Sequence, residues 1–62
     1  MKNAYLIIKV DNRDYYSTEY EILGTYRNKK NAEEHLKRTS EILALEMNIN
    51  LYAELVVITF DD

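Results

Sequence analysis

Hydrophobic residues recur at helical spacing in one long stretch of this chain, residues 28–47. They form a single stripe made of Ala32, Leu36, Thr39, Leu43 and Met47, widened by Ile42. Charged residues fill the positions between, so one side of this helix should contact a sheet while the other faces water. Asn28 can cap the first turn, and Asn48 and Asn50 suit the end of the helix. The pattern therefore predicts one amphipathic helix over about residues 29–47.

Three other segments have the alternation or the β-branched content that is typical of strands. We predict strands over about residues 4–10, 18–26 and 51–60. Residues 11–17 are turn-rich, so they should join the first two strands in an antiparallel hairpin. The first strand is apolar on both sides, which is typical of a central strand. We therefore predict an α+β fold of order β-β-α-β with strand order 2-1-3 and one helix packed on one face of the sheet. The alternative places the third strand beside the second and parallel to it.

One helix covers only one face of a three-stranded sheet, so the other face is the informative surface. The alternation predicts an apolar uncovered face that carries Tyr5, Ile7 and Leu23, with either Leu55 and Val57 or Val56 and Ile58 from the third strand. Such positions are normally polar, and an exposed apolar patch on a small monomer marks an interaction surface. We therefore expect this face, or an exposed strand edge, to be buried against another chain. Homodimerisation and docking to a different macromolecule are both consistent with it.

Gly24 is the only glycine in the chain and lies inside the second strand. A glycine there indicates a bulge or the close approach of another part of the backbone. We expect the helix to pack closely over it; a ligand pressed against the strand is the alternative. The alternation places Tyr20, Ile22 and Tyr26 on the same face as Gly24, and we expect Tyr20 and Tyr26 to pack beneath the helix.

Tyrosine is frequent, with six residues in 62. It combines a large apolar area with a polar tip, which suits interfaces. Tyr15 and Tyr16 lie next to each other at the predicted hairpin connection and are candidates for a protruding recognition element. The alternative is that one packs over the sheet edge while the other is exposed. Glu19 and Glu21 add an acidic rim to this candidate protein interface.

Size and charge narrow the functional classes. A chain of 62 residues without cysteine makes one small domain that no disulfide can stabilise, so a partner often supplies part of its stability. Residues 27–38 hold five basic and two acidic side chains, whereas the rest of the chain holds three basic and nine acidic ones. An acidic protein with one basic corner is not typical of a general nucleic-acid binder.

The basic corner consists of Arg27, Lys29 and Lys30, at the start of the predicted helix. Free N–H groups and the helix dipole favour anions there, so a phosphate or nucleic-acid backbone could bind. Simple solvation of these side chains is the other interpretation.

Candidate catalytic groups are scarce. His35 is the sole histidine, and Asn31 and Thr39, one turn away, do not complete a metal site with it. Without cysteine or a second histidine the usual nucleophile–base pairs are missing. We therefore expect no catalysis, no cofactor and no metal. The chain shows neither a signal peptide nor an apolar stretch long enough to cross a bilayer, so we expect a cytoplasmic location.

The segment from residue 21 to residue 36, EILGTYRNKKNAEEHL, resembles a motif common in small phage and prophage proteins. In these proteins a strand ends in glycine, a small or apolar residue and an aromatic, and a polar cap, lysines and an Ala-Glu helix follow. The motif describes a strand-to-helix turn, so no catalytic residue carries over. The resemblance implies a phage-encoded accessory protein in a bacterial host cell, such as an anti-CRISPR-like inhibitor of a host or defence protein.

The sequence as a whole thus predicts a small non-catalytic protein-binding module that acts by occluding a surface of its partner. A nucleic-acid or phosphate-binding accessory protein and a purely structural homodimer are the alternatives.

Overall fold

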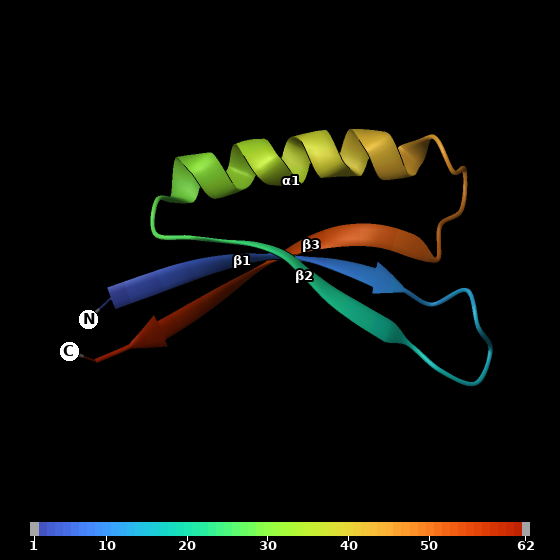
Figure 1. The fold of residues 1–62 in the computed structure, drawn as a ribbon, viewed down its shortest axis with the longest axis horizontal. Helices are drawn as coiled ribbons and strands as arrows, with labels where there is room; N and C mark the ends of the chain where they lie inside the picture. The colour runs from blue at the N-terminus through green and yellow to red at the C-terminus, as the bar shows by residue number, and fades with distance from the viewer. Residues whose placement is uncertain (1, 62) are drawn as a thin grey trace.

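The computed structural model describes residues 2–61 and shows one helix lying along one face of a three-stranded sheet (Figure 1). The strands are β1 (Lys2–Asp11), β2 (Glu19–Tyr26) and β3 (Leu51–Phe60), and the helix is α1 (Lys29–Ala44). The strand order is β2-β1-β3, and both outer strands run antiparallel to β1. The predicted α+β fold and strand order are therefore confirmed. Within the described residues, no helix has the length and apolar content needed to cross a membrane.

The start of α1 lies where the sequence places it. Asn28 has an extended backbone, and its side-chain oxygen accepts hydrogen bonds from the backbone N–H groups of Lys30 at 2.9 Å and Asn31 at 3.3 Å. Ala32 is fully buried against the sheet, as the stripe predicts. The cap therefore fixes the phase in which the helix presents its apolar side.

The end of α1 differs from the prediction. The helix stops at Ala44, and Met47 then adopts a left-handed backbone conformation with φ 54°. Met47 and Ile42 are both exposed. The last turn of the predicted stripe therefore does not pack on the sheet, and Met47, not Asn48 or Asn50, occupies the left-handed position.

A bulge in β2 decides which residues face α1. Ile7 of β1 lies opposite Gly24, whereas the next residue, Ile8, lies opposite Ile22. Leu23 is therefore an extra residue on β2. Because side chains alternate between faces along a strand, one extra residue exchanges the two faces on either side of the bulge.

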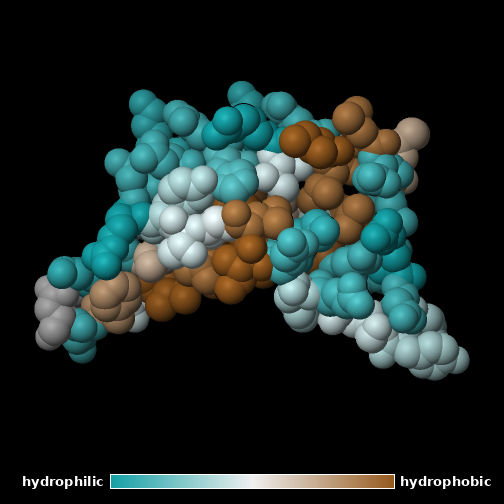
Figure 2. Space-filling model, viewed as in Figure 1, coloured by the Kyte–Doolittle hydropathy of each residue, from teal (hydrophilic) through white to brown (hydrophobic). Residues whose placement is uncertain are grey.

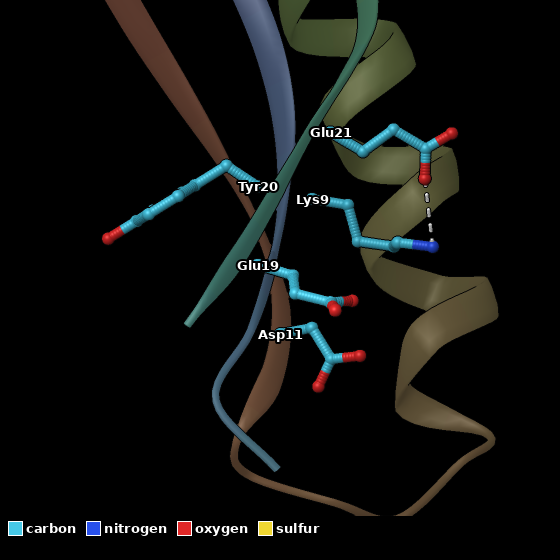
Figure 3. Close-up of a pocket in the computed structure, with 5 residues that line it drawn as sticks. All are labelled: Lys9, Asp11, Glu19, Tyr20 and Glu21. Atoms are coloured by element: carbon cyan, nitrogen blue, oxygen red, sulfur yellow. Dashed lines mark ion pairs between the residues drawn. The ribbon is translucent and has the colours of Figure 1, made fainter. Parts of the chain in front are cut away.

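Contacts with α1 identify the covered face. A Cβ atom built at Gly24 would lie 3.0 Å from the ring of His35, and the Tyr26 hydroxyl lies 2.8 Å from Nδ1 of His35. Gly24 and Tyr26 therefore face α1, which confirms the expected close packing of the helix over the glycine. Beyond the bulge, Tyr20 points away from α1 (Figure 3), Ile22 lies on the same side opposite Ile8, and both are exposed. The prediction that these four β2 residues share one face is wrong, and Tyr20 does not pack beneath the helix.

The central strand consequently faces the opposite way from the prediction. Tyr5 lies opposite Tyr26 and Ile7 lies opposite Gly24, so both lie under α1, and Ile7 is 0% exposed. The assignment of Tyr5 and Ile7 to the uncovered face is therefore wrong. Because β1 is apolar on both sides, its own pattern does not distinguish the two faces.

Pairing with β1 also settles the orientation of β3. Leu55 lies opposite Ile7 and therefore faces α1, whereas Val56 lies opposite Leu6 on the other side. Of the two alternative sets from the third strand, the one with Val56 and Ile58 is on the uncovered face.

The core between the two layers is small. Of the buried hydrophobic side chains of residues 2–61, Ile7, Ala32 and Leu51 lie between the sheet and α1. Val10 is also buried, but it lies on the other face of the sheet, between Tyr20 and Tyr52. A domain of this size buries a smaller fraction of its surface than a larger domain does, so further burial against another chain is a large relative gain in stability.

Candidate functional site

The sheet face opposite α1 is apolar along most of its length, and we call it the open face. Its apolar side chains are Ala4, Leu6, Ile8, Val10, Tyr20, Ile22, Tyr52, Val56, Ile58 and Phe60. Figure 2 shows hydrophobic atoms along the side of the sheet that lies away from α1, whereas the outer surface of α1 is hydrophilic over most of its length and hydrophobic only near its C-terminal end. A solvated sheet face normally carries polar residues, so the open face has the composition of a buried surface.

Tyrosines cover the deepest part of the open face. Val10 lies opposite Tyr20 on one neighbouring strand and Tyr52 on the other, and it is only 2% exposed. Tyr20 and Tyr52 are themselves exposed. Their rings therefore form the accessible surface at this end of the open face.

Two polar side chains interrupt the middle of the open face. Thr25 lies opposite Leu6, and Glu54 lies opposite Ile8. Glu54 is exposed and carries a charge among apolar neighbours. A partner that covered this face would need a cation or hydrogen-bond donors beside Glu54, because burying an unpaired carboxylate is costly.

The β1–β2 loop presents two tyrosines to solvent. Tyr15 and Tyr16 are each 91% exposed, and their rings make an edge-to-face contact with centroids 5.0 Å apart. Neither ring packs over the sheet edge, so the alternative interpretation of this pair is wrong. The tip of the hairpin therefore offers two large aromatic side chains to a partner.

Side-chain hydrogen bonds hold this loop in shape. Asp14 accepts from the backbone N–H of Tyr16 at 3.0 Å and from the Ser17 hydroxyl at 3.2 Å. At the base of the loop the Thr18 hydroxyl donates to the side chain of Asn12. The backbone N–H of Asn12 also donates to the carbonyl of Asn50 at 2.7 Å, which ties the hairpin to the segment that precedes β3. The two tyrosines thus extend from an ordered turn.

An acidic groove lies beside α1, on the opposite side of the sheet from the open face. It has a volume of about 400 Å³ and is lined by Lys9, Asp11, Glu19, Tyr20 and Glu21. Figure 3 shows the two glutamates, Asp11 and Lys9 on the side of α1, while the ring of Tyr20 points the other way. Lys9 pairs with Glu21 at 3.1 Å. The groove therefore has a negative balance that suits a basic group.

The predicted interface residues do not form one surface. Ile7 is buried and Tyr5 is half-buried, both on the side of α1, and Leu23 is half-buried at the bulge. Glu19 and Glu21 line the acidic groove, whereas Tyr15 and Tyr16 lie at the tip of the hairpin. The structure instead brings together side chains that the sequence interpretation did not place on this face, above all Ile8, Tyr20 and Ile22.

Arg13 fixes the charge at one end of the acidic groove. Its Nε lies 2.9 Å from Oδ1 of Asp11, and its Nη2 lies 2.7 Å from Oδ2. This side-chain contact, with a further hydrogen bond from the Arg13 backbone, lowers the pKa of Asp11 from 3.8 to about 2. Asp11 therefore remains ionised in all but strongly acidic solution.

Replacing Arg13 by alanine should return the pKa of Asp11 from about 2 toward 3.8. Because the folded-state pKa is lowered, the contact stabilises the fold above about pH 4, and this contribution is lost as the pH falls toward about 2. A carbon-13 NMR titration of the Asp11 carboxyl measures both pKa values. Lys9→Ala is the control, since Lys9 has the smaller influence on this group, and a wild-type pKa near 3.8 would contradict the contact.

The basic corner is exposed, but some of its charged and hydrogen-bonding groups already have partners within the chain. Arg27, Lys29 and Lys30 are exposed, and Lys29 Nζ lies 3.9 Å from the Glu33 carboxylate. The N–H groups of Lys30 and Asn31, which an anion would use, donate to the Asn28 side chain. No observation therefore favours an anion site here over solvation, and binding of phosphate or nucleic acid stays a prediction.

His35 has a structural environment. Its ring makes an edge-to-face contact with the ring of Tyr26, with centroids 5.6 Å apart, and Nδ1 forms a hydrogen bond with the Tyr26 hydroxyl. The same ring packs over Gly24. Across residues 2–61 no three histidine, aspartate or glutamate side chains form a group that could hold a metal ion. The expectation that the chain is not an enzyme stays a prediction.

The chain matches no protein-family model, no curated protein and no solved structure. The resemblance of residues 21–36 to phage proteins therefore indicates a strand-to-helix turn and assigns no family. We therefore infer function from the geometry of the open face, the hairpin and the groove.

Proposed function

We propose that this chain is a non-catalytic protein-binding module whose open face is buried against a partner protein. The supporting observation is the composition of that face, which is apolar at nearly every position although no helix of the described residues packs on it. Exposed apolar patches of this kind mark interaction sites on small proteins. Aromatic residues such as Tyr20, Tyr52 and Phe60 are the side chains that most often dominate binding energy.

Charge indicates what the partner should carry. The chain has a net charge of −3, Glu54 lies within the open face, and Glu19 and Glu21 lie in the groove on the other side of β2. The partner that fits is a different protein with a mainly apolar surface, a basic group or hydrogen-bond donors opposite Glu54, and further basic residues toward the edge formed by β2. Complementary charge would speed its association and fix its orientation on the sheet.

Occlusion is the mode of action that such a module supports. A rigid sheet that covers a functional surface of its partner blocks that surface without chemistry. A phage-encoded inhibitor of a host or defence protein in the bacterial cytoplasm, including an anti-CRISPR protein, would act in this way. The phage origin and the inhibitory role rest on the resemblance of residues 21–36 alone and stay predictions.

A matched pair of isoleucines tests the open face. Ile22 on the open face is 63% exposed, and Ile42 on α1 is 65% exposed. Ile22→Lys should weaken partner capture by at least about tenfold, because a lysine would be buried among apolar groups, whereas Ile42→Lys should leave capture unchanged. The readout is affinity capture from bacterial lysate by wild type and both variants, compared by quantitative mass spectrometry.

The partner is the protein that wild type and Ile42→Lys retain and Ile22→Lys loses. Both variants should keep the wild-type circular dichroism spectrum, because both side chains are exposed. If no retained protein distinguishes the two variants, the open face is not the binding surface.

A further inference from the structure

We propose that the outer edge of β3 pairs with β3 of a second copy of this chain, so that two sheets join into one continuous sheet about a two-fold axis. The proposal does not depend on the proposed function, because it uses the backbone at the strand edge instead of the side chains of the open face. It would leave the open faces of both copies available on the same side of the joined sheet.

The edge of β3 lacks the features that prevent strands from pairing with other chains. Its ten residues, Leu51–Phe60, contain no proline and no lysine, and their pairing with β1 is continuous without a bulge. Glu54 is the only charged residue in this strand. A long, regular, apolar edge of this kind is a template for another strand.

The other edge of the sheet is protected. β2 has eight residues, and its register is interrupted by the bulge at Leu23 next to Gly24. Glu19 and Glu21 place two charges in its first half. Bulges and charged side chains are the usual means of keeping an edge strand unpaired. The asymmetry between the two edges therefore points to β3 as the pairing edge.

The residue pattern of β3 is compatible with antiparallel pairing to itself. Residues with the same facing must lie opposite each other if α1 of both copies is to lie on one side of the joined sheet. With Val56 on the two-fold axis, Tyr52 lies opposite Phe60 of the second copy, which forms two aromatic cross-strand pairs. Glu54 then lies opposite Ile58 of the second copy. The two Glu54 carboxylates are four positions apart along the ladder, or about 13 Å, so they do not face each other.

Side chains along the β3 edge are accessible on both faces of the sheet. Val57 is 49% exposed although it lies on the side of α1, and Ile58 on the open face is 44% exposed. Between α1 and the start of β3 is a hollow of about 210 Å³ whose lining includes Ser40, Ala44 and Ala53 and no charged residue. This hollow therefore presents no charged side chain that would oppose a second strand beside β3.

Sedimentation equilibrium of three variants tests the proposal. Wild type should form a reversible dimer, and Val57→Lys should weaken dimerisation by at least about tenfold, because two lysines enter the joined sheet. Ile42→Lys on α1 and Ile22→Lys on the open face should both dimerise as wild type does. Wild type that stays monomeric up to about 1 mM would overturn the proposal. So would a dimer that Ile22→Lys disrupts and Val57→Lys does not, since that dimer would use the open face.

Hydrogen exchange of wild type gives a second readout that needs no substitution. Backbone amides of β3 that point away from β1 should exchange fast in dilute solution and slowly at concentrations where the dimer forms. The exchange of outward-pointing amides of β2 should not depend on concentration. Concentration-dependent protection of β2 instead of β3 would contradict the pairing of β3 edges.

Discussion

Ile7→Ala should destabilise the fold by about 2–5 kcal/mol, the usual cost of truncating a large buried aliphatic side chain. Ile7 is 0% exposed and lies between Gly24 and Leu55 on the neighbouring strands, beneath α1. A domain of 62 residues has a total stability of only about 3–9 kcal/mol, so the variant should be partly or wholly unfolded near 37 °C. Urea denaturation followed by circular dichroism measures the loss.

Ile22→Ala is the matched control for Ile7→Ala. It removes the same atoms from a side chain that is 63% exposed on the open face, so it should cost less than about 1 kcal/mol in the isolated chain. Equal losses for the two variants would show that Ile7 is not the centre of the core. A loss at Ile22 that appeared only at high protein concentration would instead indicate that the open face is buried between copies.

The elements of this fold are predictable because each has a clear local signal. The stripe from Ala32 to Leu43 has helical period, and Asn28 supplies the cap that the structure shows. β1 is apolar on both sides, which correctly indicates a central strand. The helix end is less predictable, since Met47 continues the apolar stripe yet turns out of the helix in a left-handed conformation.

The facing of the sheet is not predictable from alternation alone. β1 carries apolar side chains on both of its faces, so either set would suit the core. The bulge at Leu23 then exchanges the faces within β2, and an extra residue leaves no mark in a pattern of alternating side chains. Gly24 was the available signal. A bulge beside it would have placed Ile22 and Tyr20 on the open face.

The sheet keeps an uncovered apolar face in spite of this exchange of residues, and we expect it to be an interaction surface. The uncovered face follows from the number of helices and strands, since α1 covers one face whichever side chains lie there. The uncovered face is apolar because β1 carries apolar side chains on both of its faces. Tyr5 and Ile7 lie on the side of α1, and Leu6 and Ile8 lie on the open face instead. A general feature of the chain therefore predicts an uncovered apolar face, although the assignment of Tyr5 and Ile7 to that face is wrong.

Gly24→Val should destabilise the fold by about 2 kcal/mol, because the new side chain has no space under α1. A Cβ at Gly24 would already lie 3.0 Å from Cε1 and Nδ1 of His35 and 3.0 Å from Cε2 of Tyr26. The methyl groups of valine extend further, so α1 must move away or the hydrogen bond between Tyr26 and His35 must break. Thermal unfolding should shift down by about 8–16 °C. Thr25→Val, at the next position on the open face, should leave the melting temperature nearly unchanged.

A double-mutant cycle separates steric crowding from a general effect of valine on β2. If the ring of His35 is the obstacle, His35→Ala should cost stability in the wild type but restore part of it in Gly24→Val, with a coupling of about 1 kcal/mol or more. Additive effects would mean that α1 does not pack over Gly24. The cycle thus tests the one contact that fixes which face of the sheet α1 covers, and with it the identity of the residues left on the open face.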